Sequence, residues 1–253
     1  MIDVTHRINA VARTVGTRTL EAGEARMITV ARSFPDPVEE VWDACTTAER
    51  IQRWLMPVSG ELRLGGRYQL EGNAGGVVER CDPPRSVEAT WEFGGDVSWV
   101  QLRLVPESEG RTRLELEHVA HVDEERWAQF GPGAVGVGWD GGFFGLGQHL
   151  GTGEGVTPES SAAWMASEEG VAFMRGSSEA WREASVDPDL VDTLARTLAR
   201  RRRVVLTLAA LSADAPAAAG SPDEDPPAAG PGRCGRRGGS LSDAPASIVC
   251  SIR

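Results

Sequence analysis

Lysine is absent from this sequence, because all 26 basic residues are arginine. Without lysine the chain cannot form a Schiff base with a carbonyl substrate, and it cannot supply the lysine of a P-loop. Acidic residues outnumber basic ones by 37 to 26, which gives a formal net charge of −11. This balance argues against general binding to nucleic acid or to an anionic membrane, because both require a positive surface.

Cysteine and long apolar runs are also scarce. The four cysteines, Cys45, Cys81, Cys234 and Cys250, form no C-x-x-C pair and no metal-type spacing with histidine, so we expect no metal and no cofactor. Residues 1–25 lack the continuous apolar segment of a signal peptide, and no run approaches the ~20 residues of a membrane span. We therefore expect a cytoplasmic protein.

A distinctive passage does occur over residues 34–57. An apolar strand expected over residues 27–34 leads into Pro-Asp-Pro. A helix is then predicted by apolar residues at spacings of three and four, namely Val38, Val41, Trp42 and Cys45. A second apolar cluster follows and ends in the sequence Arg-Trp-Leu-Met-Pro at residues 53–57.

The next part of the chain predicts an antiparallel meander. The clearest strand covers residues 86–93, where Val87, Ala89 and Trp91 alternate with polar residues. Turns rich in Gly, Asp and Pro separate it from further strands, expected at 60–70, 77–82, 99–105 and 112–119. In the strand over 60–70 we expect Leu62, Leu64, Tyr68 and Leu70 on one face, with a turn or bulge at Gly65-Gly66. Short strands joined in this way are typical of an antiparallel sheet.

The period then changes to that of an amphipathic helix over residues 132–150. This helix holds seven glycines: Gly133, Gly136, Gly138, Gly141, Gly142, Gly145 and Gly147. Each interior glycine destabilises a helix by about 1 kcal/mol relative to alanine, so something must offset the loss. Two explanations stay open: a close approach of the helix to the sheet, or a soft helix that moves to admit a ligand.

These patterns divide the chain into four parts. Residues 1–25 are expected to be an irregular lead-in, residues 26–150 the main domain, and residues 151–195 a helical extension packed on it. The extension should hold two short helices over 157–184, the first capped by Thr157 before Pro158. Residues 196–253 are of low complexity and are expected to be disordered. Because a shifted reading frame also produces such a composition, we hypothesise a frameshift near Arg196, which an intact frame on resequencing would contradict.

The strand, the helix pair and the positions of Trp42 and Trp54 resemble the START-like, helix-grip superfamily, most closely its branch named after the activator of Hsp90 ATPase. The resemblance covers residues 26–150. The glycine-rich helix also resembles the carboxy-terminal helix of bacterial members. It implies an α+β fold, in which a curved antiparallel sheet wraps around a long C-terminal helix, with two short helices after the first strand. It also implies an apolar cavity between helix and sheet, and it carries no catalytic residues to this chain.

Aromatic residues are the candidates for the cavity wall, because tryptophan combines a large apolar area with one N–H donor. Each is either plain core or a ligand contact, and the residues alone leave both open. The ligand-binding candidates are Trp54, Tyr68, Trp91, Phe93, Trp99, Trp139, Phe143 and Leu146. The polar groups that would serve an inward-facing role are Arg67, Glu79, Arg103 and His118.

Two further patterns are weaker. Residues 131–136 match G-x-G-x-x-G, but an acidic segment precedes them in place of a buried parallel strand, so chance is the better explanation in a chain with 30 glycines. His118 and His121 lie beside Glu115 and Glu117, where a metal site or acid–base pair would need a third ligand that the spacing does not supply. A solvated strand end is the favoured interpretation, and the catalytic residues stay unknown.

Three hypotheses of function follow. The first is a protein that binds a hydrophobic or aromatic small molecule between the sheet and the helix over 132–150. The second is an enzyme of the polyketide cyclase or hydratase kind, for which an inward carboxylate or histidine would speak. The third is a protein-interaction module or Hsp90 co-chaperone-like ATPase activator, for which a filled core and an exposed apolar patch would speak. Nucleic acid and membranes are not expected as partners.

Overall fold

The computed structural model describes residues 4–186, so the predicted tail over 196–253 lies outside the described residues. The helices are α1 (Val4–Asn9), α2 (Val38–Thr46), α3 (Ala48–Ile51), α4 (Glu124–Phe130), α5 (Gly133–Thr152), α6 (Pro158–Met165) and α7 (Glu168–Ala184). The strands are β1 (Ala12–Leu20), β2 (Gly23–Phe34), β3 (Val58–Gly60), β4 (Arg67–Leu70), β5 (Gly75–Asp82), β6 (Ser86–Phe93), β7 (Asp96–Ser108) and β8 (Arg111–Ala120).

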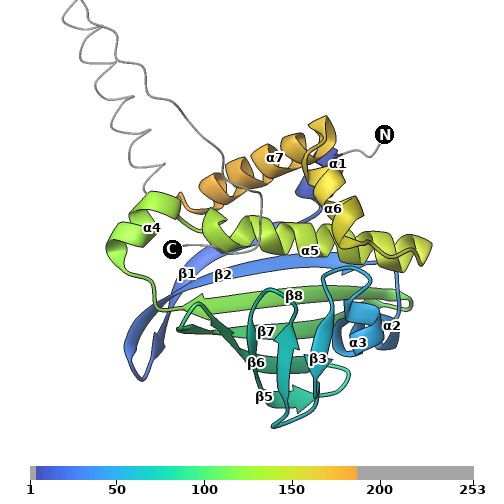
Figure 1. Ribbon diagram of the computed structural model, residues 1–253, viewed down its shortest axis with the longest axis horizontal. Coiled ribbons are helices and arrows are strands. Elements are labelled where there is room, and N and C mark those ends of the chain that lie inside the picture. Colours follow the sequence, from blue (N-terminus) through green and yellow to red (C-terminus); the bar gives the residue numbers. More distant parts are fainter. Residues whose placement is uncertain (1–3, 187–253) are drawn as a thin grey trace, which may run out of the picture. The chain divides into compact units, whose positions relative to one another are not determined.

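The strands form one curved sheet in the order β1-β2-β8-β7-β6-β5-β4-β3, and every neighbouring pair is antiparallel. Helix α5 lies along one face of this sheet, and α2 and α3 lie near one end of it (Figure 1). The predicted α+β helix-grip arrangement is therefore confirmed. The main core lies between α5 and the sheet, where Phe34, Leu114 and Leu146 are almost fully buried.

Strand β6 shows why the meander forms as expected. Its bounds are those predicted, and its apolar residues alternate with polar ones, so one face turns to the core and the other to solvent. The register with β7 places Ala89 opposite Val100, and on the outer face Glu88 opposite Gln101. The outer face is held by polar pairs, such as Gln101 Nε2 donating to Glu88 Oε1 at 2.7 Å.

The amino-terminal segment differs from the expectation. Residues 1–25 were expected to be irregular, but they contain helix α1 and the edge strand β1, which pairs with β2 over its whole length. The inner face of β1 carries Arg13 where an apolar residue would normally mark a strand, opposite Val30. Because Arg13 is buried against Asp140 of α5, a charged residue occupies a core-facing position and hides the alternation.

The predicted single strand over residues 60–70 is also wrong. The chain forms β3 and β4 with a loop of residues 61–66 between them, and the expected turn at Gly65-Gly66 lies in that loop. Gly65 has φ of +74°, a left-handed conformation that favours glycine. As a result Leu64 is 61% exposed rather than part of a strand face.

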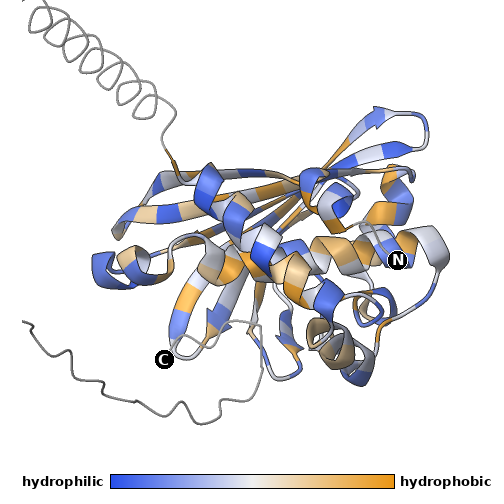
Figure 2. Ribbon diagram, turned by 90° about the horizontal axis from the view of Figure 1, so that it is seen from above, coloured by the Kyte–Doolittle hydropathy of each residue, from blue (hydrophilic) through white to orange (hydrophobic). Residues whose placement is uncertain are grey.

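Helices α6 and α7 form a further layer. Thr157 caps α6 with a capping box and Pro158 stands at its first turn, as predicted. Helix α7 is a full 17 residues rather than the short helix expected, and it lies over α5 (Figure 1). Seen from above, α7 carries hydrophilic residues along its outer side (Figure 2). Its buried side brings Phe173 against Phe144 of α5 and Trp164 of α6.

Candidate ligand-binding cavity

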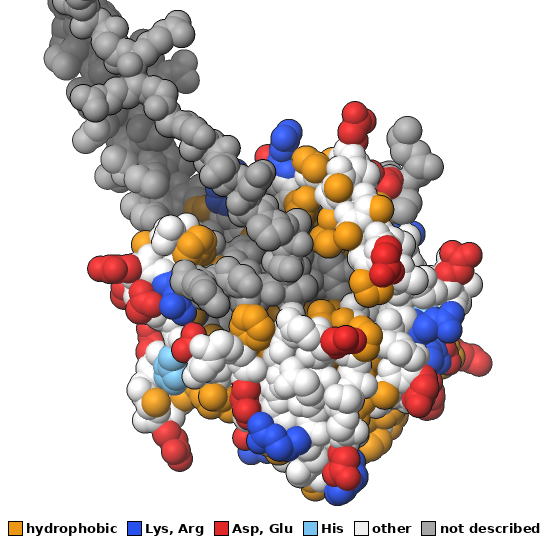
Figure 3. Space-filling view, in the orientation of Figure 1, with side chains coloured by type: hydrophobic (Ala, Val, Ile, Leu, Met, Phe, Trp, Pro, Cys, Tyr) orange, Lys and Arg blue, Asp and Glu red, His pale blue; other side chains and the backbone are white. Residues whose placement is uncertain are grey.

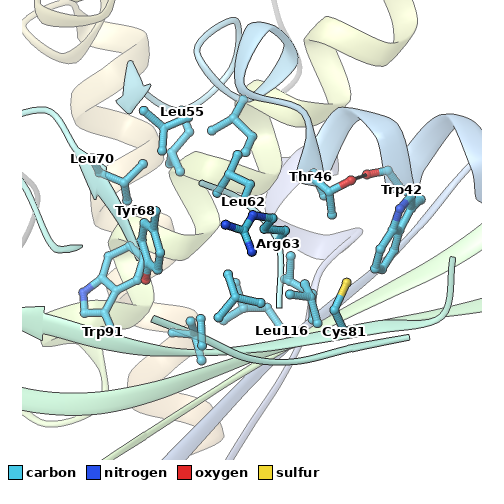
Figure 4. A pocket seen from close by; sticks show the side chains of 18 of the residues that line it. Trp42, Thr46, Leu55, Leu62, Arg63, Tyr68, Leu70, Cys81, Trp91 and Leu116 are labelled. Atoms are coloured by element: carbon cyan, nitrogen blue, oxygen red, sulfur yellow. Dashed lines mark hydrogen bonds between the residues drawn. The ribbon is translucent and has the colours of Figure 1, made fainter. Parts of the chain in front are cut away.

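A cavity of about 450 Å³ lies between the α2–α3 pair, the part of the sheet from β4 to β8, and α5 (Figure 4). This volume falls within the range of small-molecule sites, which runs from about 300 to 1,000 Å³. Its sheet wall consists of Tyr68, Leu70, Val78, Cys81, Val87, Ala89, Trp91, Val100, Leu102 and Leu116. Its helix wall consists of Trp42, Cys45, Thr46, Ile51 and Trp139, together with Trp54 and Leu55 of the turn after α3. Val58 of β3 and residues of the connecting segments complete it: Leu62, Arg63, Leu64 and Pro83.

A β-bulge shapes the sheet wall. The pairing of β5 with β6 shifts register between Val78 and Arg80, at Glu79. In a regular strand, residues three apart face opposite sides, so Val78 and Cys81 could not both face the cavity. The extra residue at the bulge restores the inward direction of Cys81 while Glu79 stays exposed.

Most polar atoms on the wall are already hydrogen-bonded within the protein. The indole N–H of Trp54 donates to the Ala44 carbonyl at 2.9 Å, and the Tyr68 hydroxyl donates to the Thr90 carbonyl at 2.7 Å. The Thr46 hydroxyl likewise donates to a backbone carbonyl of its own helix. These donors are therefore not available to a ligand, and the wall offers a bound molecule mainly apolar contacts.

Two titratable groups of the wall, Cys45 and Tyr68, stay neutral because they are buried. Burial raises the pKa of the Cys45 thiol to about 12, and burial followed by the Glu92 charge raises the pKa of Tyr68. Among the described lining residues there is no carboxylate and no histidine. Within residues 4–186 no group of three or more His, Cys, Asp or Glu residues could hold a metal ion. The site is suited to holding an apolar molecule rather than to proton transfer.

His118 lies behind the wall in a closed chain of hydrogen bonds. The Trp139 indole N–H donates to His118 Nδ1 at 3.0 Å, so the ring proton is on Nε2, which faces the Ser98 hydroxyl at 2.8 Å. Ser98 in turn donates to the Trp91 carbonyl at 3.1 Å. These bonds fix the positions of two tryptophans that line the cavity, and they require neutral His118.

This network predicts a pH effect on stability. Burial lowers the pKa of His118 from 6.5 to about 4, so between these values the unfolded chain binds a proton that the folded chain does not. Stability should therefore fall as the pH drops from 6.5 to 4, by about 3 kcal/mol from this group. Urea unfolding at both pH values should show this loss in the wild-type chain and a smaller loss in His118→Gln. An exposed-site control, His121→Gln, should lose as much as wild type, and an equal loss in all three would contradict the assignment.

The structure brings together half of the predicted aromatic set. Trp54, Tyr68, Trp91 and Trp139 line the cavity. Four other predictions do not fall on its wall: Phe93, Trp99, Phe143 and Leu146.

Each of the four has a physical reason. Trp99 pairs with Thr90 across the strands and so points to the outer face, where its ring lies edge-on to His121 at 6.2 Å between centroids. Phe93 lies at the end of β6, beyond the cavity. Phe143 and Leu146 are buried in the main core under α5.

The predicted polar set is mostly wrong as a cavity lining. Arg67 and Glu92 form an ion pair at 2.8 Å on the outer face. Arg103 lies opposite Glu115 on the outer face, with 3.6 Å between Arg103 Nη1 and Glu115 Oε1. Glu79 is the exposed residue of the β-bulge. Only His118 lies near the wall. It does not line the cavity, but its Nδ1 accepts a hydrogen bond from the lining residue Trp139.

The first helix pair and the 61–66 loop contribute to the cavity wall, although no strand pattern predicted it. Trp42 and Cys45 were placed on the apolar face of the predicted helix but were not assigned to the cavity. Arg63 had no sequence signal, because its position depends on where the loop crosses the sheet.

The G-x-G-x-x-G segment begins at the C-cap of α4 and enters α5, so no strand precedes it, and chance stays the better explanation.

Comparison with known proteins places these features in context. The model of the family described as Activator of Hsp90 ATPase homolog 1-like protein matches residues 36–151. The crystal structure of CalU16 from Micromonospora echinospora is 36% identical, with a TM-score of 0.55, over 69% of this chain and 98% of CalU16. The solution structure of CalU16 is 37% identical, with a TM-score of 0.59, over 69% of this chain and 94% of that one.

A third solved structure, of MLL2253 from Mesorhizobium loti, is 26% identical with a TM-score of 0.45 and covers 50% of this chain and 97% of its own. No significant match was found among the curated proteins. None of the helices within residues 4–186 combines the length and apolar character that crossing a membrane requires.

Proposed function

The chain belongs to the Activator of Hsp90 ATPase homolog 1-like family, and on that premise we propose that it binds a flat apolar or aromatic small molecule in its cavity. The observation that carries the proposal is the cavity itself, about 450 Å³ in volume and lined almost throughout by apolar side chains. Four tryptophans face it: Trp42 of α2, Trp54 of the turn after α3, Trp91 of β6 and Trp139 of α5. Their rings offer broad surfaces on which an aromatic ring can stack.

The other two hypotheses have less support. An enzyme of the cyclase or hydratase kind would use an inward carboxylate or histidine, and the described lining residues include neither. A protein-interaction module would favour a filled core with a contiguous apolar patch outside. The large exposed apolar residues of the described part instead come from separate elements, such as Val105 of β7 and Val171 of α7. The face in Figure 3 carries charged side chains of both signs.

The proposal is tested with N-phenyl-1-naphthylamine, a neutral aromatic probe whose fluorescence rises in apolar surroundings. The full chain should bind it with micromolar affinity, and Ala89→Trp should weaken binding by at least about tenfold, because the new ring would occupy the cavity from the centre of β6. Trp91→Ala should also weaken binding, by removing part of the wall.

A matched control adds the same ring elsewhere on the sheet. Val105 is 45% exposed on β7 and does not line the cavity, so Val105→Trp should bind the probe as wild type does. Urea unfolding should show Ala89→Trp folded. No binding by the wild-type chain, or equal binding by Ala89→Trp, would rule the proposal out.

A further inference from the structure

We propose that the molecule held in the cavity carries one anionic group, such as a carboxylate, on an otherwise apolar body, and that Arg63 binds this group. The inference rests on the proposed function. Arg63 is the one charged side chain among the described lining residues. It comes from the 61–66 loop between β3 and β4, and Figure 4 shows its guanidinium among the lining side chains.

The donors of Arg63 differ from four other polar groups of the wall. The hydroxyls of Thr46 and Tyr68 and the indole N–H groups of Trp54 and Trp139 each donate to an acceptor inside the protein. Arg63 instead has a single described partner, Glu61, to which Nη2 donates at 2.6 Å. A guanidinium has five N–H donors in a planar fork that matches a carboxylate. Most of its donors therefore remain for a ligand.

The contact with Glu61 is easily replaced. The side chains of Arg63 and Glu61 are 70% and 58% exposed, and ion pairs between such exposed side chains contribute little, because water screens them. A carboxylate on a ligand seated in the cavity would meet the same guanidinium against an apolar wall, where a charge-assisted pair is stronger. A wholly neutral ligand would cover part of Arg63 without giving it a partner, which is unfavourable.

The experiment compares two probes of nearly the same shape, anthracene-2-carboxylate and anthracene-2-carboxamide, by fluorescence titration of the full chain. The acid should bind about tenfold more tightly than the amide, because a hydrogen bond between two charged groups is stronger than one to a neutral amide. Arg63→Gln should remove this preference by weakening the acid alone. Glu61→Gln should strengthen the acid, because it removes the competing carboxylate.

Arg80→Gln is the matched control, because Arg80 is an exposed, ion-paired arginine of β5 outside the cavity lining. It should keep the preference for the acid. Equal binding of acid and amide to the wild-type chain, an unchanged preference in Arg63→Gln, or an equal weakening of both probes would overturn the inference and leave cavity binding standing. If neither of the two anthracene derivatives nor N-phenyl-1-naphthylamine binds, the proposed function fails and this inference fails with it.

Discussion

Replacing Asp140 with alanine is expected to lower the free energy of unfolding by about 3–5 kcal/mol, because it leaves the buried guanidinium of Arg13 without its counter-charge. Arg13 Nε donates to both carboxylate oxygens of Asp140, at 2.9 and 3.2 Å. The two side chains are only 6% and 1% exposed, so water cannot replace the lost partner.

The pair also ties separate elements together. Asp140 lies on α5 and Arg13 on β1, while Ser177 and Trp181 of α7 both donate to the same carboxylate oxygen. Burial raises the pKa of Asp140, and these three partners oppose that effect by favouring the charged form. Removal of the carboxylate therefore breaks the contacts of the edge strand and of the outer helix at one point.

Urea unfolding followed by tryptophan fluorescence measures the effect. The matched control is Asp43→Ala, which removes an aspartate that pairs with Arg50 at 2.9 Å but is 50% exposed, and it should lose less than about 1 kcal/mol. The double variant Arg13→Met with Asp140→Leu should recover part of the lost stability, because it removes the uncompensated charge. The recovery should be incomplete, because the buried donors of Ser177 and Trp181 lose their acceptor. A loss in Asp140→Ala no larger than in Asp43→Ala would show that the pair does not hold the elements together.

This buried pair also explains where sequence reasoning about the fold succeeded and where it did not. Strand β6 was located to the residue because its apolar and polar residues alternate, as the two faces of the sheet demand. Strand β1 was missed because Arg13 occupies a core-facing position. Its buried charge is stabilised by the carboxylate of Asp140, which lies far along the sequence. Contacts between residues 127 positions apart leave no local pattern.

The cavity was predicted in part for a similar reason. In β7 the structure turns Val100 and Leu102 inward, so Trp99 and Arg103, both predicted for the cavity, lie on the outer face. Parity failed for β5, where the bulge at Glu79 changes which residues face inward. The position of Arg63 follows from the course of a loop, and loops carry no periodicity from which a direction can be read.

The glycine-rich helix α5 is the second case in which local reasoning left two explanations open. The structure shows close approaches at some of these glycines. A Cβ on Gly136 would lie 2.3 Å from the Trp181 ring, and one on Gly145 would lie 2.5 Å from the Trp54 carbonyl oxygen. A Cβ on Gly138 would meet nothing within 4 Å. These partners belong to α7 and to the turn after α3, not to the sheet as the first explanation supposed. Close packing against neighbouring segments therefore accounts for Gly136 and Gly145 but not for Gly138.

Gly136→Ala and Gly138→Ala are accordingly expected to change stability in opposite directions. Trp181 is fully buried and its indole N–H is held by Asp140 at 3.1 Å, so its ring cannot move aside for the new methyl group. Gly136→Ala should lower the free energy of unfolding by about 1–3 kcal/mol, the usual effect of overpacking. Gly138→Ala should raise it by about 0.5–1 kcal/mol, because alanine favours the helix and the space is open.

The same two variants distinguish the two explanations for the glycines of α5, namely close packing and a helix that deforms to admit a ligand. Urea unfolding gives the stabilities, and stopped-flow binding of N-phenyl-1-naphthylamine gives the association rate. If close packing is the reason for the glycines, Gly138→Ala binds the probe at the wild-type rate while its stability rises. A slower association in this stabilised variant would show instead that α5 must deform to admit a ligand. Equal stabilisation of both variants would contradict the role of Gly136, because the Trp181 contact would then place no limit on the side chain at that position.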